Sequence, residues 1–352
     1  MREGVGITTL LDQVMAETET KRDLLASDPL LKIRHEIERG VLMDIAEESM
    51  VVRDYAQGQL ASKLDIPAKY WARMLKEAPE LLAVNANTWL GRSDKRRLLR
   101  TIRGEVRAVL SPGYRIRDNL DLMECVVPIL REANCKVESC NVSETHLHIQ
   151  ATLPTLEREL KLGDVVRAGI VISNSEVGAG KTKVMPMVYR LRCLNGMVIM
   201  EGGMGAAHIG RNMDGGDDIP EEWIKDETRM AEDRAWWLKI ADSLRGSLSE
   251  ANFSLTLDRI QASTGRAITK DPVQVIEVVK KRLNLTDKER GAALLALCSG
   301  ENDMTQWGLA NSITGLANSS DVPYDRAVDL EVMGGQVAQW SSAEWNEINR
   351  QN

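Results

Sequence analysis

Four groups of residues in this sequence have types and spacings that could do chemistry. The first is SEVGAGKT, from Ser175 to Thr182, which differs at one position from the phosphate-binding loop G-x-x-x-x-G-K-[ST]. That loop holds phosphate because its lysine and threonine begin a helix whose free N–H groups face the anion. Here Thr182 is followed by KVMPMVYRLRC, in which Pro186 and alternating apolar residues predict a strand. We therefore predict a hairpin loop whose glycines supply positive φ, and not an ATPase loop.

The second group is a run of basic residues in the middle of the chain. The segment from Gly91 to Arg117 carries nine basic and two acidic residues, although the whole chain has a net charge of −7. Arginines along a sheet with a tyrosine beside them can follow a phosphate backbone and stack a base. The alternative is that they pair with the abundant carboxylates of the chain, within one protomer or across an interface. The candidate nucleic-acid-binding residues are Arg96, Arg97, Arg100, Arg103, Arg107, Tyr114, Arg115, Arg117, Arg190 and Arg192.

The third group is a pair of histidines, His146 and His148, which alternate along an expected strand and therefore share one face. Cys135 and Cys140 lie nearby in sequence, but C-x4-C followed by H-x-H does not have the compact spacing of a zinc knuckle. We expect solvent-facing histidines and no metal. The alternative is a metal-dependent nuclease that uses these histidines and nearby carboxylates.

The fourth group, His208 and Arg211, lies in a glycine-rich segment, where it could contact phosphate or simply be exposed. The chain has no G-x-S-x-G motif and no cysteine beside a histidine, so no nucleophilic triad is indicated. The sequence does not indicate a cofactor, and on balance it favours a protein that is not an enzyme.

The composition predicts a soluble, cytoplasmic protein. Hydrophobic residues make up 43% and charged residues 28% of the 352 residues. No stretch approaches the roughly eighteen apolar residues of a membrane span, and the N-terminus lacks the apolar segment of a secretion signal. Five cysteines without regular spacing favour a reducing compartment. The charge is unevenly placed: residues 1–90 have a net charge of −4, residues 91–213 of +6 and residues 214–352 of −9.

Hydrophobic periodicity predicts an α+β fold with three regions. Residues 1–90 are expected to be helical, and QLASKLDIPAKYWARML is expected to form two short helices around an Ile-Pro turn, for which packing is favoured over DNA reading. Residues 91–213 are expected to form the core, a central antiparallel sheet with a packed helix that begins near Asp118. Residues 214–352 are expected to be helical again.

Several segments, in chain order, carry a resemblance that spans roughly residues 50 to 340. They are QLASKLDIPAKYWARM, LLRTIRGEVRAVLSPGYRIRDNLDLMECVVP, ISNSEVGAGKTKVMPMVYRLRCLNGMVI, HIGR, TQWGLANSITGLAN and YDRAVDLEVMGGQV. In these segments the chain resembles the phage/plasmid-related protein family of unknown function, whose members are frequent in prophages, plasmids and genomic islands. The resemblance implies a mobile-element origin and a cytosolic setting, and it brings no settled biochemical activity.

Together these observations predict a non-catalytic mobile-element protein that binds single-stranded nucleic acid through a central basic sheet. Its use would be in phage or plasmid replication or recombination, such as strand annealing, as a monomer or as a homo-oligomer. Two alternatives stay open: an accessory or counter-defence protein that binds a host protein, and the metal-dependent nuclease.

Overall fold

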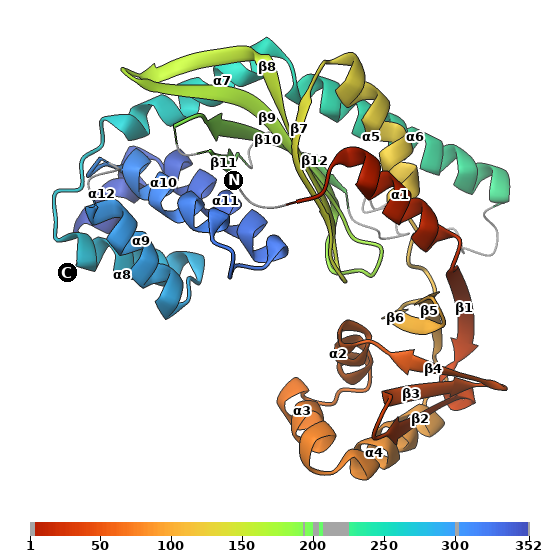
Figure 1. Ribbon diagram of the computed structural model, residues 1–352. Helices are drawn as coiled ribbons and strands as arrows, with labels where there is room; N and C mark the ends of the chain where they lie inside the picture. Colours follow the sequence, from red (N-terminus) through yellow and green to blue (C-terminus); the bar gives the residue numbers. More distant parts are fainter. Residues whose placement is uncertain (1–3, 193, 200–203, 207–224, 300–302, 351–352) are drawn as a thin grey trace.

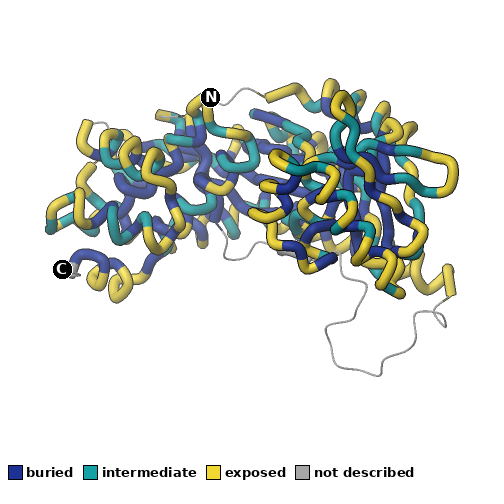
Figure 2. Tube along the Cα trace, turned by 90° about the horizontal axis from the view of Figure 1, so that it is seen from below, coloured by how far each residue is buried: buried dark blue, intermediate teal, exposed yellow. Residues whose placement is uncertain are grey.

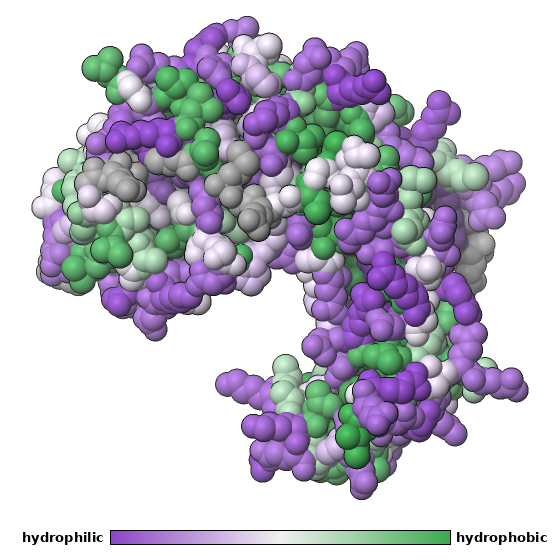
Figure 3. Space-filling model, viewed as in Figure 1, coloured by the Kyte–Doolittle hydropathy of each residue, from purple (hydrophilic) through white to green (hydrophobic). Residues whose placement is uncertain are grey.

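The computed structural model describes residues 4–192, 194–199, 204–206, 225–299 and 303–350, and these form an α+β fold with twelve α-helices (Figure 1). Two sheets organise the fold. One is a mixed sheet of six strands, and the other is a curled antiparallel sheet of five strands with a short further strand beside it. Each sheet is the centre of a lobe, and a broad hollow separates part of the two lobes (Figure 3).

The N-terminal lobe contains the mixed sheet, whose strands run in the order β1-β5-β6-β4-β3-β2. Neighbouring strands are antiparallel except for β4 and β6, which are parallel. The strands are β1 (Lys21–Ser27), β2 (Leu31–Glu36), β3 (Gly40–Ile45), β4 (Glu48–Val52), β5 (Arg96–Ile102) and β6 (Glu105–Leu110).

Two predictions for this part of the chain are wrong. Residues 1–90 are not helical throughout, because α1 (Ile7–Thr18) is followed by the four strands β1 to β4. In β2, burial alternates from Leu31 to Arg34, and this period of two is present in the sequence. The strand predicted from Glu105 exists as β6, but it belongs to the N-terminal sheet and not to the antiparallel sheet.

Three helices pack against the mixed sheet: α2 (Asp54–Lys63), α3 (Ala68–Glu77) and α4 (Pro79–Arg92). Their side chains Leu60, Trp71 and Leu82 share one core with Ile33 and Leu99 of the strands. The predicted helix pair is therefore confirmed, and the buried face of its second helix packs within the lobe.

The second sheet is an antiparallel meander in the order β11-β10-β9-β8-β7, and β12 pairs with β10. The predicted hairpin whose loop contains SEVGAGKT is confirmed: β9 and β10 pair antiparallel on its two sides, Thr182 begins a strand, and Gly178 has a φ of +76°. The strands are β7 (Lys136–Val142), β8 (Leu147–Lys161), β9 (Asp164–Asn174), β10 (Thr182–Arg190), β11 (Asn195–Val198) and β12 (Met204–Ala206).

Helices cover both faces of this sheet. On one face α1, α5 (Asn119–Glu132) and α6 (Asp226–Ser247) form a core with Ile170 and Ile172 of β9. The intervening Val171 contacts a different cluster, which includes Val328 of α11. Because successive strand residues point to opposite faces, the run AGIVI of β9 is buried from both sides.

The C-terminal helices form the rest of this lobe and pack on β8 to β11. The side chain of Asp271 caps α8, and Thr286 and Glu289 form a capping box at the start of α9. The helices are α7 (Glu250–Gln261), α8 (Pro272–Leu283), α9 (Asp287–Cys298), α10 (Gln306–Gly315), α11 (Tyr324–Gln339) and α12 (Ser342–Arg350).

Two successive glycines let α11 lie close to both of its neighbours. A Cβ at Gly334 would overlap the Thr314 side chain of α10, and a Cβ at Gly335 would overlap the backbone carbonyl of Val198 in β11. Since Asp325 lies in the first turn of this helix, the close packing at the glycines also positions that carboxylate.

Buried residues concentrate in the inner strands of both sheets and on the inner faces of the helices, while exposed residues lie at turns, on the outer helix faces and in β1 at the edge of the mixed sheet (Figure 2). Within the described residues, no helix is long and apolar enough to cross a bilayer.

Gly335→Ala is expected to lower the free energy of unfolding by about 3 kcal/mol, because the backbone carbonyl of Val198 cannot rotate away from the added methyl group. Chemical denaturation measures this change. The matched control is Gly291→Ala in α9, where a Cβ meets nothing within 4 Å. That variant is expected to be neutral or more stable by up to about 1 kcal/mol. Equal loss of stability in both variants would contradict the close packing of α11 on β11.

Candidate functional site

The first arginines of the basic run lie on β5, and they differ in burial. Arg96 is exposed. Arg97 is buried, and its guanidinium donates to the two carboxylate oxygens of the buried Asp28 at 2.9 and 2.8 Å. This bidentate pair satisfies both charges, and therefore Arg97 does not face a ligand in this conformation.

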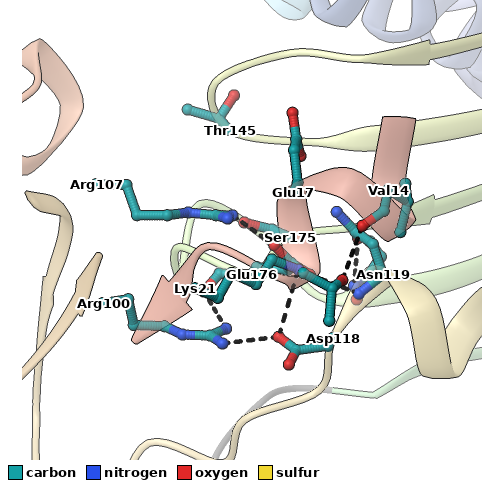
Figure 4. A network of polar contacts seen from close by, with 12 residues as sticks. Val14, Glu17, Lys21, Arg100, Arg107, Asp118, Asn119, Thr145, Ser175 and Glu176 are labelled. Carbon is teal, nitrogen blue, oxygen red and sulfur yellow. Dashed lines mark hydrogen bonds and ion pairs between the residues drawn. The ribbon is translucent and has the colours of Figure 1, made fainter. Parts of the chain in front are cut away.

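Arg107 of β6 contacts the buried carboxylate of Glu176, which lies at the start of the loop between β9 and β10 (Figure 4). Arg107 Nη2 lies 2.6 Å from Glu176 Oε2, and Lys21 Nζ lies 2.6 Å from Oε1. The backbone N–H of Asn119, at the start of α5, also donates to Oε1 at 2.6 Å. One carboxylate from the lobe of the antiparallel sheet thus binds two cations from the N-terminal lobe.

Arg100 of β5 belongs to the same network and is only 2% exposed. Its guanidinium donates to Asp23 at 2.8 Å, to Asp118 at 2.7 Å and to the backbone carbonyl of Glu176 at 3.0 Å (Figure 4). These three acceptors come from β1, from the segment before α5 and from the loop after β9. Arg100 therefore joins the two sheets.

The network sets the protonation of Glu176. Burial alone would raise the pKa of this carboxyl group, but the charges of Arg107 and Lys21 and the hydrogen bond from Asn119 outweigh burial and lower its pKa to about 2. Glu176 is therefore ionised across the neutral pH range.

Arg115 and Arg117 contact α6. Arg115 Nε lies 2.9 Å from Asp233 Oδ1. The Arg117 guanidinium lies 3.8 Å from the centre of the Trp236 ring, and burial lowers the pKa of Arg117 to about 10. Tyr114 donates its hydroxyl to the carbonyl of Ser175 at 3.1 Å, and burial raises its pKa.

The remaining candidates are spread over the two lobes. Arg190 of β10 pairs with the buried Asp164 at 2.6 Å. Arg192 is exposed, and so is Arg103, which lies in the β5–β6 turn 3.9 Å from Glu17. The ten candidates do not form one continuous surface: Arg97, Arg100, Arg107 and Arg190 have the internal pairing that the sequence left open as the alternative.

The two histidines are not solvent-facing, and that expectation is wrong. His148 is 4% exposed, and its Nε2 lies 3.1 Å from Asp325 Oδ1. His146 is partly exposed, and its Nδ1 lies 3.4 Å from Asp325 Oδ2. The cause is α11, whose first turn covers this end of β8. Cys140 is buried in the apolar core on the other face, where burial raises its pKa to about 12. His208 and Arg211 lie outside the described residues.

A cavity with a volume of about 830 Å³ lies where α2 meets the loops after β6 and β9. Tyr55 and Lys63 come from α2, Tyr114 follows β6, and Gly178 and Lys181 belong to the loop that contains SEVGAGKT. Helix α2 borders the hollow between the lobes (Figures 1 and 3). The phosphate-loop-like segment thus lines a cavity although it does not begin a helix.

Lys63 has an unusual electrostatic environment. Burial, together with repulsion from Arg97 and Lys95, lowers the pKa of Lys63, while Asp28 partly opposes this effect. Within the described residues, no carboxylate lies within ion-pair distance of its ammonium group. An anion in the cavity would relieve the repulsion.

No protein-family model, curated protein or solved structure matches this chain.

The sequence did not indicate the acidic partners of these groups. Asp28 follows a strand that was predicted as helix, and Asp325 lies 177 residues after His148 along the chain. Lys63 could have been found, because it lies in QLASKLDIP at the end of a helix that was predicted correctly. The sequence does not indicate that the C-terminal end of α2 and the β9–β10 loop line the same cavity.

Glu176→Gln is expected to reduce the free energy of unfolding by roughly 3–5 kcal/mol, because Lys21 and Arg107 would stay buried without a counter-charge. The control is Glu105→Gln, which removes the more exposed pair with Arg53 and is expected to cost about 0–1 kcal/mol. Denaturant titration at neutral pH measures both.

The pH dependence follows from the same carboxyl group. Because the pKa of Glu176 is lower in the folded state than its ordinary value of 4.5, its ionisation stabilises the fold above that pH. This contribution is expected to be lost as the pH falls from about 4.5 to about 2. The difference in stability between the wild type and Glu176→Gln should therefore shrink over this range. A difference that does not change with pH would contradict the assignment.

Proposed function

We propose that this protein binds single-stranded nucleic acid in the cavity between α2 and the β9–β10 loop. The observation that supports the proposal most directly is the lining of the cavity, which places two tyrosines, two lysines and glycine backbone around one space. This differs from the arginine run of the sequence analysis, because Arg97, Arg100, Arg107 and Arg190 are buried and have internal acidic partners.

The size and the aromatic lining favour an unstacked nucleotide. A volume of about 830 Å³ lies within the range of small-molecule sites, roughly 300–1,000 Å³. Tyr55 and Tyr114 offer rings beside lysines, and base–aromatic stacking with backbone neutralisation is how single strands are bound without sequence preference. A duplex keeps its bases paired inside the helix, so it could not present a base to such a cavity.

The charges favour a phosphate. Lys63 and Lys181 line the cavity, and the lining contains one carboxylate among the described residues, Asp54. Lys95 lies close enough to Lys63 to lower its pKa, and the exposed Arg96 follows it in sequence. These cations would line a path for a single nucleic-acid strand from the cavity to the surface of the N-terminal lobe.

The glycines favour close contact with the backbone of a ligand. Gly178 and Gly180 carry no side chain that would fill the space, and Gly178 has a positive φ, which favours glycine. With the resemblance to phage and plasmid proteins, we place this binding in replication or recombination of a mobile element, such as strand annealing.

Binding is tested with a labelled single-stranded oligonucleotide and with its duplex, by fluorescence anisotropy over a series of salt concentrations. Lys63→Gln and Lys181→Gln are each expected to flatten the slope of log affinity against log salt by about 0.7, because each removes one counterion-releasing contact. Tyr55→Ala is expected to weaken binding by roughly 1–3 kcal/mol with the slope unchanged, because it removes a stacking partner and no charge.

Two controls belong to this experiment. Lys69→Gln changes an exposed lysine of α3 that does not line the cavity, and it should leave affinity and slope near those of the wild type. Arg97→Gln should lower stability, because it leaves Asp28 buried without its partner. If the wild type does not bind a single strand at low salt, or if Lys69→Gln weakens binding as much as Lys63→Gln, the cavity is not a nucleic-acid site. The accessory protein that binds a host protein then becomes the leading function.

A further inference from the structure

We propose that His146, His148 and Asp325 bind one divalent transition-metal ion of the zinc type. Their ligand atoms, two imidazole nitrogens and a carboxylate oxygen, all lie within 4.8 Å of one another. His148 lies at the start of β8, His146 directly before that strand, and Asp325 in the first turn of α11. The proposal concerns ion binding alone, and it does not rest on the proposed nucleic-acid function.

The ligand types select the class of ion. Two imidazoles and one carboxylate suit zinc, iron and related divalent metals, whereas magnesium and calcium prefer oxygen ligands. Asp325 is the anionic member. Its two carboxylate oxygens lie 3.4 Å from His146 Nδ1 and 3.1 Å from His148 Nε2. A carboxylate beside two imidazole nitrogens offers the charge and the lone pairs that a dication requires.

The surroundings resemble the outer contacts of metal ligands. His148 Nδ1 lies 2.8 Å from Ser173 Oγ, so that the other ring nitrogen, Nε2, faces Asp325. The hydroxyls of Ser143 and Thr145 both donate to Asp325 Oδ2, at 2.9 and 2.8 Å. Such hydrogen bonds orient ligands and tune their basicity in metal sites.

Binding requires one rotation. The two imidazole planes lie at 18° to each other with centres 5.4 Å apart, and nearly parallel rings cannot both aim a nitrogen at one ion. His148 is held by Ser173 and stacks on the Tyr324 ring. His146 is less buried, with 24% of its side chain exposed, so it is the ring that turns.

The site lies next to the wall of the cavity. Gly180, which lines the cavity, packs so closely on His146 that a Cβ there would lie 2.9 Å from the ring's Nε2. Three protein ligands leave a coordination position for water, as in catalytic zinc sites. An ion here would supply a Lewis acid beside the cavity, which is the chemistry that the nuclease alternative needs.

The competing explanation is a hydrogen-bonded clamp, in which Asp325 only holds α11 against β8. Both explanations predict that removing Asp325 lowers stability. They differ in uptake of an ion, because a clamp contacts no metal and gains nothing when one is added.

The test uses the untagged full-length chain, stripped with a chelator and titrated with Zn²⁺. We expect about one equivalent to bind, a melting temperature that rises with Zn²⁺ concentration, and a visible absorption band with Co²⁺ that shifts when azide fills the open position. His148→Gln and Asp325→Asn are each expected to abolish stoichiometric uptake. Ser173→Ala should weaken it by roughly 10–100-fold, as loss of an outer contact does.

The matched control is His35→Gln, which changes a histidine of β2 outside the cluster and should keep full uptake. Circular dichroism checks that each variant is folded. If His148→Gln or Asp325→Asn does not fold, His146→Gln replaces it, because that side chain is the less buried of the two histidines. The proposal is overturned if the wild type takes up no more zinc than the His146→Gln/His148→Gln double variant, or if folded His148→Gln keeps one equivalent. Neither result depends on whether nucleic acid binds.

Discussion

The carboxylate of Glu176 is the contact on which the arrangement of the two lobes depends. Its side chain is fully buried, and a buried carboxylate without partners would cost several kcal/mol. Lys21 and Arg107 neutralise it from the N-terminal lobe, while the N–H of Asn119 holds it from the start of α5. Because the two cations come from the N-terminal lobe and Glu176 comes from the loop of the other sheet, these buried ion pairs hold the two lobes together.

The β9–β10 loop, residues 175–181, contains Glu176 and carries this constraint to both candidate sites. Gly178 lines the cavity, and a Cβ there would contact Leu110 and Tyr114, so the loop lies directly against the end of β6. Two residues later, Gly180 lies beside His146. One seven-residue loop thus lines part of the cavity and also contacts the histidine cluster. The ion pairs of Glu176, near the start of this loop, hold it in place.

The sequence predicts the elements whose pattern is local and misses those that depend on a distant partner. The β8–β9–β10 meander, the α2–α3 pair and the cap of α8 follow from periodicity and capping residues. KRDLLAS, by contrast, has no β-branched residue and reads as the end of a helix. It forms β1 because β5, which lies some 70 residues later in the chain, pairs with it along its whole length. Tertiary pairing overrides propensity in such a strand.

The same reasoning explains why the charge pattern did not predict the site. The basic middle segment has a net charge of +6, but several of its arginines pair with carboxylates that lie far away along the chain. Asp23 and Asp28 come before the segment, Asp233 comes after it, and Glu176 lies within it, 69 residues after Arg107. Charges that are separated along the chain are therefore neutralised in space. Lys63, which lies near the cations Arg97 and Lys95 and for which Asp28 opposes their effect only in part, becomes distinctive only after this pairing is known. A count of basic residues along the sequence cannot separate such a lysine from the arginines that folding pairs with carboxylates, and this is why the proposed site could not be derived from the charge pattern.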